Sequence, residues 1–200
     1  MARHVDYYVS LNSPWTYLGS KRFEAIAAKH GAGVTIWPVD FGPVFAVSGG
    51  LPLPKRAPQR QAYRMMELKR WRDRLGVPLT LQPKFFPANE APAARCVVAL
   101  REQGRMADAI RLAHAVLHAL WVDEKNTGDA ATLRDIVAGC GLDADAVLEA
   151  ADAPDIAATR EAYTRHAIEQ GVFGAPSFVI DGEIFWGQDR LDFVDAKLAG

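Results

Sequence analysis

Hydrophobic and polar positions follow two different periods along the chain, and the strand-type period is confined to the two ends. Residues 3–10 and 34–39 are short runs rich in β-branched and aromatic side chains, which predict two strands. Between them apolar residues recur at helical spacing, so a helix is expected from residue 14 to about residue 31. The first forty residues therefore predict a β-α-β unit with parallel strands and a right-handed crossover.

The C-terminal end returns to strand-type sequence. Residues 177–180 and 183–186 are rich in apolar and aromatic side chains, and Asp181-Gly182 between them is a dipeptide favoured in hairpin turns. A final helix is expected over residues 190–198. The end of the chain thus predicts a β-β-α unit.

The middle of the chain has a helical pattern interrupted by loops. Residues 42–58 include Gly49-Gly50-Leu51-Pro52-Leu53-Pro54 and predict a long loop, and residues 82–89 predict a second loop. The helices expected here cover residues 59–75, 90–103, 106–121, 130–139, 143–151 and 154–170.

The predicted order is βαβ, a helical block, then ββα. Removal of the block leaves a four-stranded mixed sheet with helices on it, so the fold class is α/β, a thioredoxin-like fold with a large all-helical insertion. We expect residues 1–45 and 171–200 to form the thioredoxin-like domain and residues 46–170 to form the insertion.

Composition and charge narrow the function classes. The 23 basic and 24 acidic residues nearly cancel, which gives no sign of a nucleic-acid or membrane-surface partner. No apolar run approaches the length of a membrane span, and the first residues carry no apolar leader, so a cytoplasmic protein is expected. Cys96 and Cys140 stand alone and five histidines are scattered, so no metal site is expected and both thiols are interpreted as inert.

The first candidate site is Ser13, in the tetrad Ser13-Pro14-Trp15-Thr16 at the first strand-to-helix junction. A helix N-terminus offers unpaired N–H groups and the positive end of the helix dipole, and thioredoxin-like folds place a redox cysteine there. Without cysteines the site cannot exchange disulfides, but it can stabilise a thiolate that a ligand brings. The simpler interpretation is that Ser13 only caps the helix.

Two further segments are expected beside Ser13. In a thioredoxin-like sheet, a proline at the position of Pro176 is cis and faces the first helix, leaving the backbone of Ala175 to pair with an extended peptide. Residues 187–190, Gly-Gln-Asp-Arg, start the last helix and offer N–H groups to a carboxylate, with Asp189 placed for an ammonium group. Both segments also have plain structural interpretations, as a strand start and a helix cap.

Taken together, these segments resemble the 2-hydroxychromene-2-carboxylate isomerases, relatives of the kappa-class glutathione transferases in the DsbA-like group. The resemblance runs over nearly the whole chain. It rests on Ser13-Pro14-Trp15-Thr16-Tyr17-Leu18, on Arg70-Trp71, on Gly171-Val172-Phe173-Gly174-Ala175-Pro176-Ser177-Phe178 and on Phe185-Trp186-Gly187-Gln188-Asp189-Arg190-Leu191.

The resemblance implies a glutathione-dependent cis–trans isomerase of aromatic catabolism, which acts by transient thiolate addition on a small aromatic carboxylate, and it implies a homodimer. Ser13 matches the family's catalytic serine. Glutathione is expected on Ser13, Pro14, Trp15, Ala175, Pro176, Gly187, Gln188, Asp189 and Arg190, and substrate near Lys55, Phe85, Phe86 and Asn89.

The substrate side matches the family less closely. The family often has an asparagine near Pro54 or Lys55, and this chain does not. The chemistry requires a cation for the substrate carboxylate, with Lys55, Arg56 and Lys84 as candidates, and an aromatic lining, with Trp15, Trp37, Phe85 and Phe86 as candidates.

Three other functions are weighed against the isomerase. A kappa-like transferase or peroxidase would consume glutathione rather than return it. A dithiol oxidoreductase is opposed by the missing cysteines. A non-catalytic thioredoxin-like module would keep Ser13 and the proline without using them, and would not bind glutathione.

Overall fold

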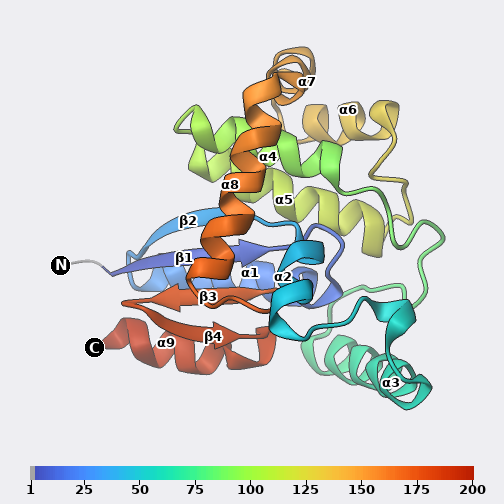
Figure 1. Ribbon diagram of the computed structural model, residues 1–200, viewed down its shortest axis with the longest axis vertical. Helices are drawn as coiled ribbons and strands as arrows, with labels where there is room; N and C mark the ends of the chain where they lie inside the picture. The colour runs from blue at the N-terminus through green and yellow to red at the C-terminus, as the bar shows by residue number, and fades with distance from the viewer. Residues whose placement is uncertain (1–2) are drawn as a thin grey trace.

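The structure is a computed structural model that describes residues 3–200, and its centre is a four-stranded mixed sheet of order β2-β1-β3-β4 (Figure 1). Strand β1 (His4–Val9) pairs in parallel with β2 (Gly33–Pro38) and antiparallel with β3 (Ser177–Ile180). Strand β4 (Glu183–Trp186) pairs antiparallel with β3. The predicted thioredoxin-like sheet is confirmed.

Helices complete the two terminal units much as expected. Helix α1 (Pro14–Lys29) connects β1 to β2, and a short turn of 3-10 helix, η2 (Gln188–Arg190), leads into α9 (Leu191–Ala199). Helix α1 stops where Gly31 adopts a φ of 59°, a conformation that favours glycine.

The inserted helices lie close to their predicted positions. They are α3 (Pro58–Leu75), α4 (Ala91–Glu102), α5 (Met106–Trp121), α6 (Ala130–Gly139), α7 (Ala144–Asp152) and α8 (Pro154–Glu169). Among the described residues, no helix is long and apolar enough to cross a bilayer.

The prediction of an uninterrupted loop over residues 42–58 is wrong. Helix α2 (Phe41–Ser48) occupies the first part, and a 3-10 turn, η1 (Leu53–Lys55), the second. Asp40 caps α2 by accepting the N–H of Gly42 at 2.9 Å, while Phe41 and Val44 are buried against the sheet. The many glycine and proline residues of this segment predicted a loop. The cap and the buried face of α2 nevertheless stabilise a short helix.

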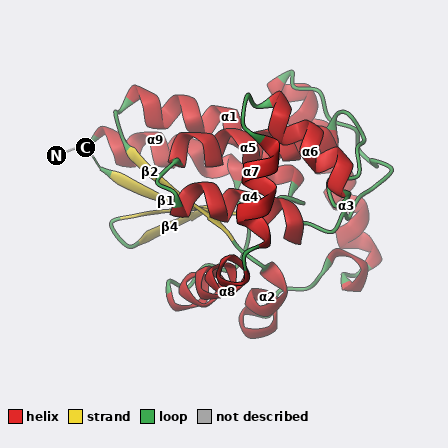
Figure 2. Cartoon of the chain, turned by 90° about the horizontal axis from the view of Figure 1, so that it is seen from above, coloured by secondary structure: helices red, strands yellow, loops and turns green. Residues whose placement is uncertain are grey.

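The helices form two layers on opposite faces of the sheet (Figure 2). Helices α2 and α8 lie on one side of the sheet and α1 and α9 on the other, while the inserted helices α4, α5, α6 and α7 lie beyond the β2 edge. Adjacent residues of β1 reach opposite layers: Tyr7 packs with Phe23 and Phe178, whereas Tyr8 packs with Val44 of α2 and Ala167 of α8. The larger apolar core runs without a break from the sheet into α4, α5, α6 and α7.

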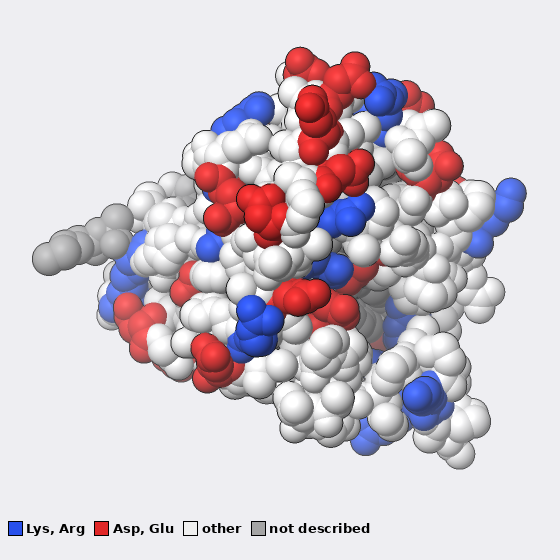
Figure 3. All heavy atoms as spheres, turned by 45° about the horizontal axis from the view of Figure 1, so that its top comes forward, with Lys and Arg blue, Asp and Glu red and all other residues white. Residues whose placement is uncertain are grey.

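Charged side chains are mixed over the surface shown in Figure 3. Acidic groups gather around the α7 end, which carries Asp145, Glu149 and Asp152, while lysines and arginines are scattered on this face. This distribution fits the near-cancelling charge of the sequence.

Candidate active site

Ser13 is the N-cap of α1. Its φ and ψ of −82° and 119° are extended, and its Oγ accepts the N–H of Thr16 at 3.1 Å. Pro14 follows as the first helical residue, and the backbone N–H of Ser13 donates to Ser10 at 3.1 Å. The sequence interpretation of Ser13 as a cap is therefore confirmed, and the hydroxyl stands at the positive end of a 16-residue helix.

The Ala175–Pro176 bond is cis and lies beside Ser13, as expected. The Ser13 hydroxyl is 3.5 Å from the carbonyl oxygen of Ala175, across 162 residues of chain. The sheet register explains this approach, because Tyr8 pairs with Ser177 and the segment preceding β3 thus reaches the end of β1. Within residues 3–200 the backbone N–H of Ala175 donates to no other group.

The turn at 187–190 is tied to the same place. The N–H of Gly187 donates to the carbonyl of Pro176 at 2.9 Å, so the turn adjoins the cis bond. Gly187 has a φ of 107°, and a Cβ built there would lie 2.4 Å from Oδ1 of Asp189, so this position requires glycine.

Gln188 and Asp189 differ in how much of each remains available to a ligand. The side-chain oxygen of buried Gln188 accepts from Arg22 at 2.8 Å, so that oxygen is used by the fold. Asp189 is exposed and its carboxylate accepts from Arg190 at 3.0 Å. The backbone N–H groups of both residues make no hydrogen bond to another described residue.

Asn12 connects Ser13 to the 82–89 loop, a link that sequence reasoning missed. Its side-chain amide donates to the carbonyl of Ala88 at 2.8 Å and accepts the N–H of Ala88 at 3.1 Å. The two partners are 76 residues apart, so no local pattern could reveal the pair. The result is that the loop with Phe85, Phe86 and Asn89 is fastened to the residue before Ser13.

Glu90, which sequence reasoning also missed, is hydrogen-bonded to the turn that leads into Ser13. Its carboxylate accepts from the Ser10 hydroxyl at 2.8 Å, from the Asn12 N–H at 3.1 Å and from Arg160 at 3.1 Å. Burial raises the pKa of this carboxyl, while the charge of Arg160 opposes that rise. The start of α1 is therefore anchored by a largely buried ion pair, whose side chains are 12% and 17% exposed.

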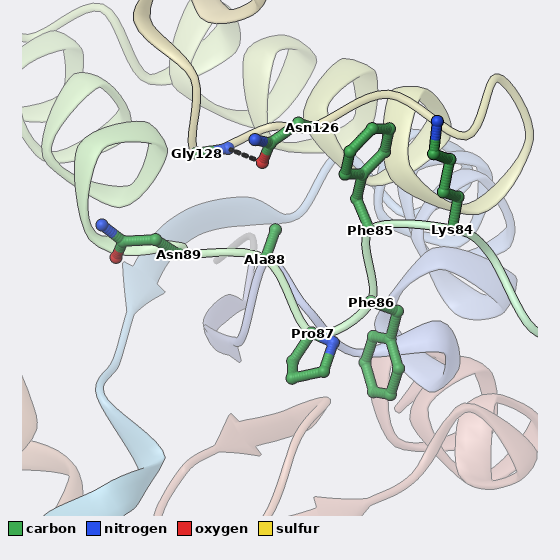
Figure 4. Close-up of a pocket in the computed structure, with 8 residues that line it drawn as sticks. All are labelled: Lys84, Phe85, Phe86, Pro87, Ala88, Asn89, Asn126 and Gly128. Carbon is green, nitrogen blue, oxygen red and sulfur yellow. Dashed lines mark hydrogen bonds between the residues drawn. The ribbon is translucent and has the colours of Figure 1, made fainter.

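Of the four expected substrate-side residues, three line one cavity and Lys55 does not. Phe85, Phe86 and Asn89 line a cavity of about 400 Å³ together with Lys84, Pro87, Ala88, Asn126 and Gly128 (Figure 4). Phe85 points to the Asn126 side of the loop and Phe86 to the opposite side. Neither Ser13 nor Ala175 lines this cavity.

Lys55 lies in η1 and is exposed, with no ion pair among the described residues. Of the other candidate cations, Arg56 donates to the carbonyl of Leu51 at 2.7 Å, and Lys84 lies 5.1 Å from the ring centre of Phe85. These three side chains are thus distributed along the loops rather than gathered at Ser13.

The candidate aromatic residues divide into two groups. Trp15, Phe85 and Phe86 pack around one apolar cluster, whose buried members include Tyr17, Leu117 and Trp121. Trp37 lies apart from this cluster, because it is on β2, its indole donates to Asp6 at 2.8 Å, and it stacks on Tyr8. The spacing of aromatic residues in sequence could not separate the two groups, because they belong to different sheet faces and helices.

The two cysteines, interpreted from sequence as inert, are free thiols in the helical insertion. Cys96 is buried in α4, where burial raises the pKa of its thiol to about 12, and burial also raises the pKa of Cys140. Thiols that stay protonated at neutral pH are poor nucleophiles. No group of acidic, histidine or cysteine side chains within residues 3–200 is suited to hold a metal ion.

Comparisons with known proteins bear on the fold and the family of the chain. Residues 4–199 match the family described as the DSBA-like thioredoxin domain. A 2-hydroxychromene-2-carboxylate isomerase of Sphingobium xenophagum is 31% identical over 199 residues, covering 99% of each chain. A solved structure of 2-hydroxychromene-2-carboxylate isomerase superposes with a TM-score of 0.83 at 25% identity, covering 98% of this chain and 94% of that one.

A more distant structure shares the fold alone. The cytosolic disulfide reductase DsbM of Pseudomonas aeruginosa, solved with GSH, has a TM-score of 0.68 at 17% identity, covering 98% of this chain and 100% of its own.

Proposed function

The chain belongs to the 2-hydroxychromene-2-carboxylate isomerase family of DSBA-like thioredoxin domains and is an isomerase, and we propose that it uses glutathione to interconvert cis and trans forms of a conjugated aromatic carboxylate. One observation carries the proposal: the Ser13 hydroxyl, at the N-terminus of α1, lies 3.5 Å from the carbonyl of Ala175. A hydroxyl at a helix N-terminus can bind a thiol, and the adjacent unpaired backbone of Ala175 can bind the peptide that carries it.

The residues present fit glutathione. The unused N–H of Ala175, with the carbonyl of the same residue, offers the pair of groups that an extended peptide takes. The unused N–H groups of Gln188 and Asp189 suit the carboxylate of a γ-glutamyl group, and the exposed carboxylate of Asp189 suits its ammonium. DsbM, a protein of the same fold, was solved with GSH.

When bound, glutathione supplies a thiolate whose reversible addition to a conjugated carbon turns the double bond into a single bond that can rotate. Ser13 is placed to donate its hydroxyl proton to the sulfur, exchanging the long contact to Ala175 for a charge-assisted hydrogen bond. The positive end of α1 lowers the cost of negative charge at the same point. Both effects favour the thiolate over the thiol.

The protein stabilises the negative charge but takes no redox role in this proposal. Thr16 stands where a second redox cysteine would lie, and its hydroxyl is buried without a partner among the described residues. Both cysteines of the chain lie elsewhere. Disulfide exchange at Ser13 therefore has no residue to carry it.

The test is a turnover assay with 2-hydroxychromene-2-carboxylate, followed by absorbance with and without glutathione, with total thiol counted at the end. The proposal expects isomerisation only with glutathione and an unchanged thiol count. A thiol count that falls with product would indicate the transferase or peroxidase alternative. Full turnover without any thiol would refute the role given to glutathione.

A further inference from the structure

Arg64 of α3 lies within the aromatic cluster beside the site. Its guanidinium carbon is 5.3 Å from the ring centre of Phe86 and 5.9 Å from that of Trp121. Trp121 is fully buried, and Arg64 itself is partly buried. A cation has thus been placed among apolar side chains, where charge is costly.

No carboxylate of residues 3–200 forms an ion pair with Arg64. The pKa of Arg64 falls to about 10, first because burial disfavours its charge and then because Arg56 is a neighbouring cation. The side chain stays charged at neutral pH, so a partly buried positive charge remains without a counter-charge.

Arg101 is a second arginine that lies over aromatic rings, and it can be compared with Arg64. Its guanidinium lies 3.7 Å from the ring centre of Trp37 and 4.0 Å from that of Tyr163. It also donates to the carbonyl of Ile36 at 3.3 Å and has Glu102 and Asp6 nearby as counter-charges. Arg64 has the stacking without the counter-charges.

A second unused donor lies in the same cluster. The indole N–H of Trp121 is buried and has no hydrogen-bond partner among the described residues. An unpaired buried donor costs free energy, which an acceptor supplied by a ligand would recover. The unpaired charge of Arg64, which stays partly exposed, therefore favours an anion at the edge of this cluster.

The cluster is linked to Ser13 on two sides. Trp15, two residues after Ser13, packs in it. Phe86 belongs to the loop whose Ala88 is hydrogen-bonded to Asn12, the residue before Ser13. An anion beside Arg64 would thus lie against the wall of the proposed site.

We propose that Arg64 binds a carboxylate of the reacting ligands. Its role rests on the proposed function, because both the aromatic substrate and glutathione carry carboxylates in that reaction. The carboxylate has two sources, the substrate or the glycine of glutathione, and guanidinium binds either one in the same bidentate way. Of the cations expected from sequence, Lys55 and Lys84 are exposed, and the partly buried guanidinium of Arg56 already donates to the carbonyl of Leu51.

The experiment compares Arg64→Met with Arg74→Met. Arg74 is a matched control, since it lies on the same helix and stacks on Trp71 at the same 5.9 Å, yet is exposed. Calorimetry measures the dissociation constants of 2-naphthoate and of its uncharged amide, and those of glutathione and γ-glutamylcysteine, which lacks the glycine. Circular dichroism checks that both variants are folded. If Arg64→Met does not fold, Arg64→Gln is measured in its place.

If Arg64 binds the substrate carboxylate, the wild-type protein should bind 2-naphthoate at least tenfold more tightly than the amide. Arg64→Met should remove this difference and Arg74→Met should not. A glycine source predicts that Arg64→Met weakens glutathione at least tenfold and leaves γ-glutamylcysteine unchanged. The proposal is overturned when Arg64→Met and Arg74→Met give the same constants in both titrations. Since these are binding measurements, they remain informative even when the turnover assay shows no isomerisation.

Discussion

The carboxylate of Glu90 accepts a hydrogen bond from the backbone N–H of Asn12 at 3.1 Å, across 78 residues of chain. The same carboxylate accepts from Ser10 and from the guanidinium of Arg160, so the turn that leads into Ser13 is fixed by groups from the residue after β1, the start of α4 and α8. The position of the serine hydroxyl therefore depends on a residue that does not contact it.

Glu90→Gln is expected to loosen this turn and to destabilise the protein. The substitution keeps an acceptor for Asn12 but leaves Arg160 without its counter-charge, in a place where both side chains are less than one-fifth exposed. Breaking a buried ion pair of this kind costs about 2–4 kcal/mol, and turnover should fall roughly tenfold as Ser13 loses its fixed position. Urea denaturation and the turnover assay measure the two effects.

Glu149→Gln is the matched control, because Glu149 is exposed on α7 and has no ion pair among the described residues. It should leave both quantities within error of the wild-type values. Equal stability of the two variants would show that the Glu90 pair is not an anchor.

Ser13→Ala should lower turnover by ~10²–10³, the usual effect of removing one donor that stabilises charge in a water-poor site. Glutathione affinity should change much less, since the other proposed contacts lie at Ala175 and the 187–190 turn. The thiolate absorbance of bound glutathione against pH tests the cause, because the thiol pKa should rise in the variant. An alanine variant that keeps both signal and rate would reduce Ser13 to a helix cap.

Loss of the cap itself must be separated from loss of the donor. Asp129→Ala removes the same kind of cap from α6, where Asp129 accepts the N–H of Thr132 at 2.9 Å, far along the chain from Ser13. Both variants should lose about 1 kcal/mol of stability, but only Ser13→Ala should lose turnover.

Asp189→Ala should weaken glutathione binding by roughly 1–3 kcal/mol, the range for a hydrogen bond to a charged group. The proposed ammonium contact is the reason, since Asp189 is exposed and pairs only with its neighbour Arg190. Asp192→Ala, which removes an almost fully exposed carboxylate one turn later, serves as the control. Calorimetry that gives one dissociation constant for both variants would leave Asp189 without a ligand role.

Stability should fall as pH is lowered from 7 towards 4, in part through His114. Burial lowers the pKa of His114 to about 4, and the charges of Lys21 and His118 act in the same direction. Between that value and the unfolded value of about 6.5 the unfolded chain binds more protons, so stability rises with pH across this window. Because the side chain is only partly buried, its share is about 1–3 kcal/mol.

His114→Asn should flatten that part of the stability curve. Urea denaturation at pH 7 and pH 4.5 gives the change in the free energy of unfolding for the wild-type protein and for the variant. The contribution of titrating carboxylates is the same in both proteins and cancels when the two changes are subtracted. The variant also loses the 2.7 Å contact to Ser20, which lowers stability at every pH and does not change the slope. Identical slopes would mean that His114 titrates alike in the folded and unfolded states.

Sequence patterns predicted the elements that repeat a period, and failed where the structure depends on contacts far along the chain. The strands and the long helices follow from periodicity and turn residues, and the approach of Ser13 to the cis bond at Pro176 was expected from the likeness to thioredoxin-like sheets. Helix α2 was missed because glycine and proline around it outweighed its cap at Asp40. Homodimer formation and the division into residues 1–45, 46–170 and 171–200 stay predictions.

Long-range polar pairs were the main omission. Asn12 with Ala88 and Glu90 with Arg160 join segments separated by 70 residues or more, and neither residue stands in a periodic or motif context. Arg64 was one basic residue among many on an amphipathic helix. Only its neighbours in space, Phe86 and Trp121, distinguish it from the others.

The strand order has a consequence for how the protein is made. Strand β1 leaves the ribosome before β2 and β3, its two neighbours in the finished sheet, and β3 begins only at residue 177. While the helical block is synthesised, the edge of β1 that later pairs with β3 is therefore unpaired in the nascent chain. An exposed strand edge can pair with strands of other chains. Chaperone dependence during translation should accordingly concentrate on the interval before β3 emerges.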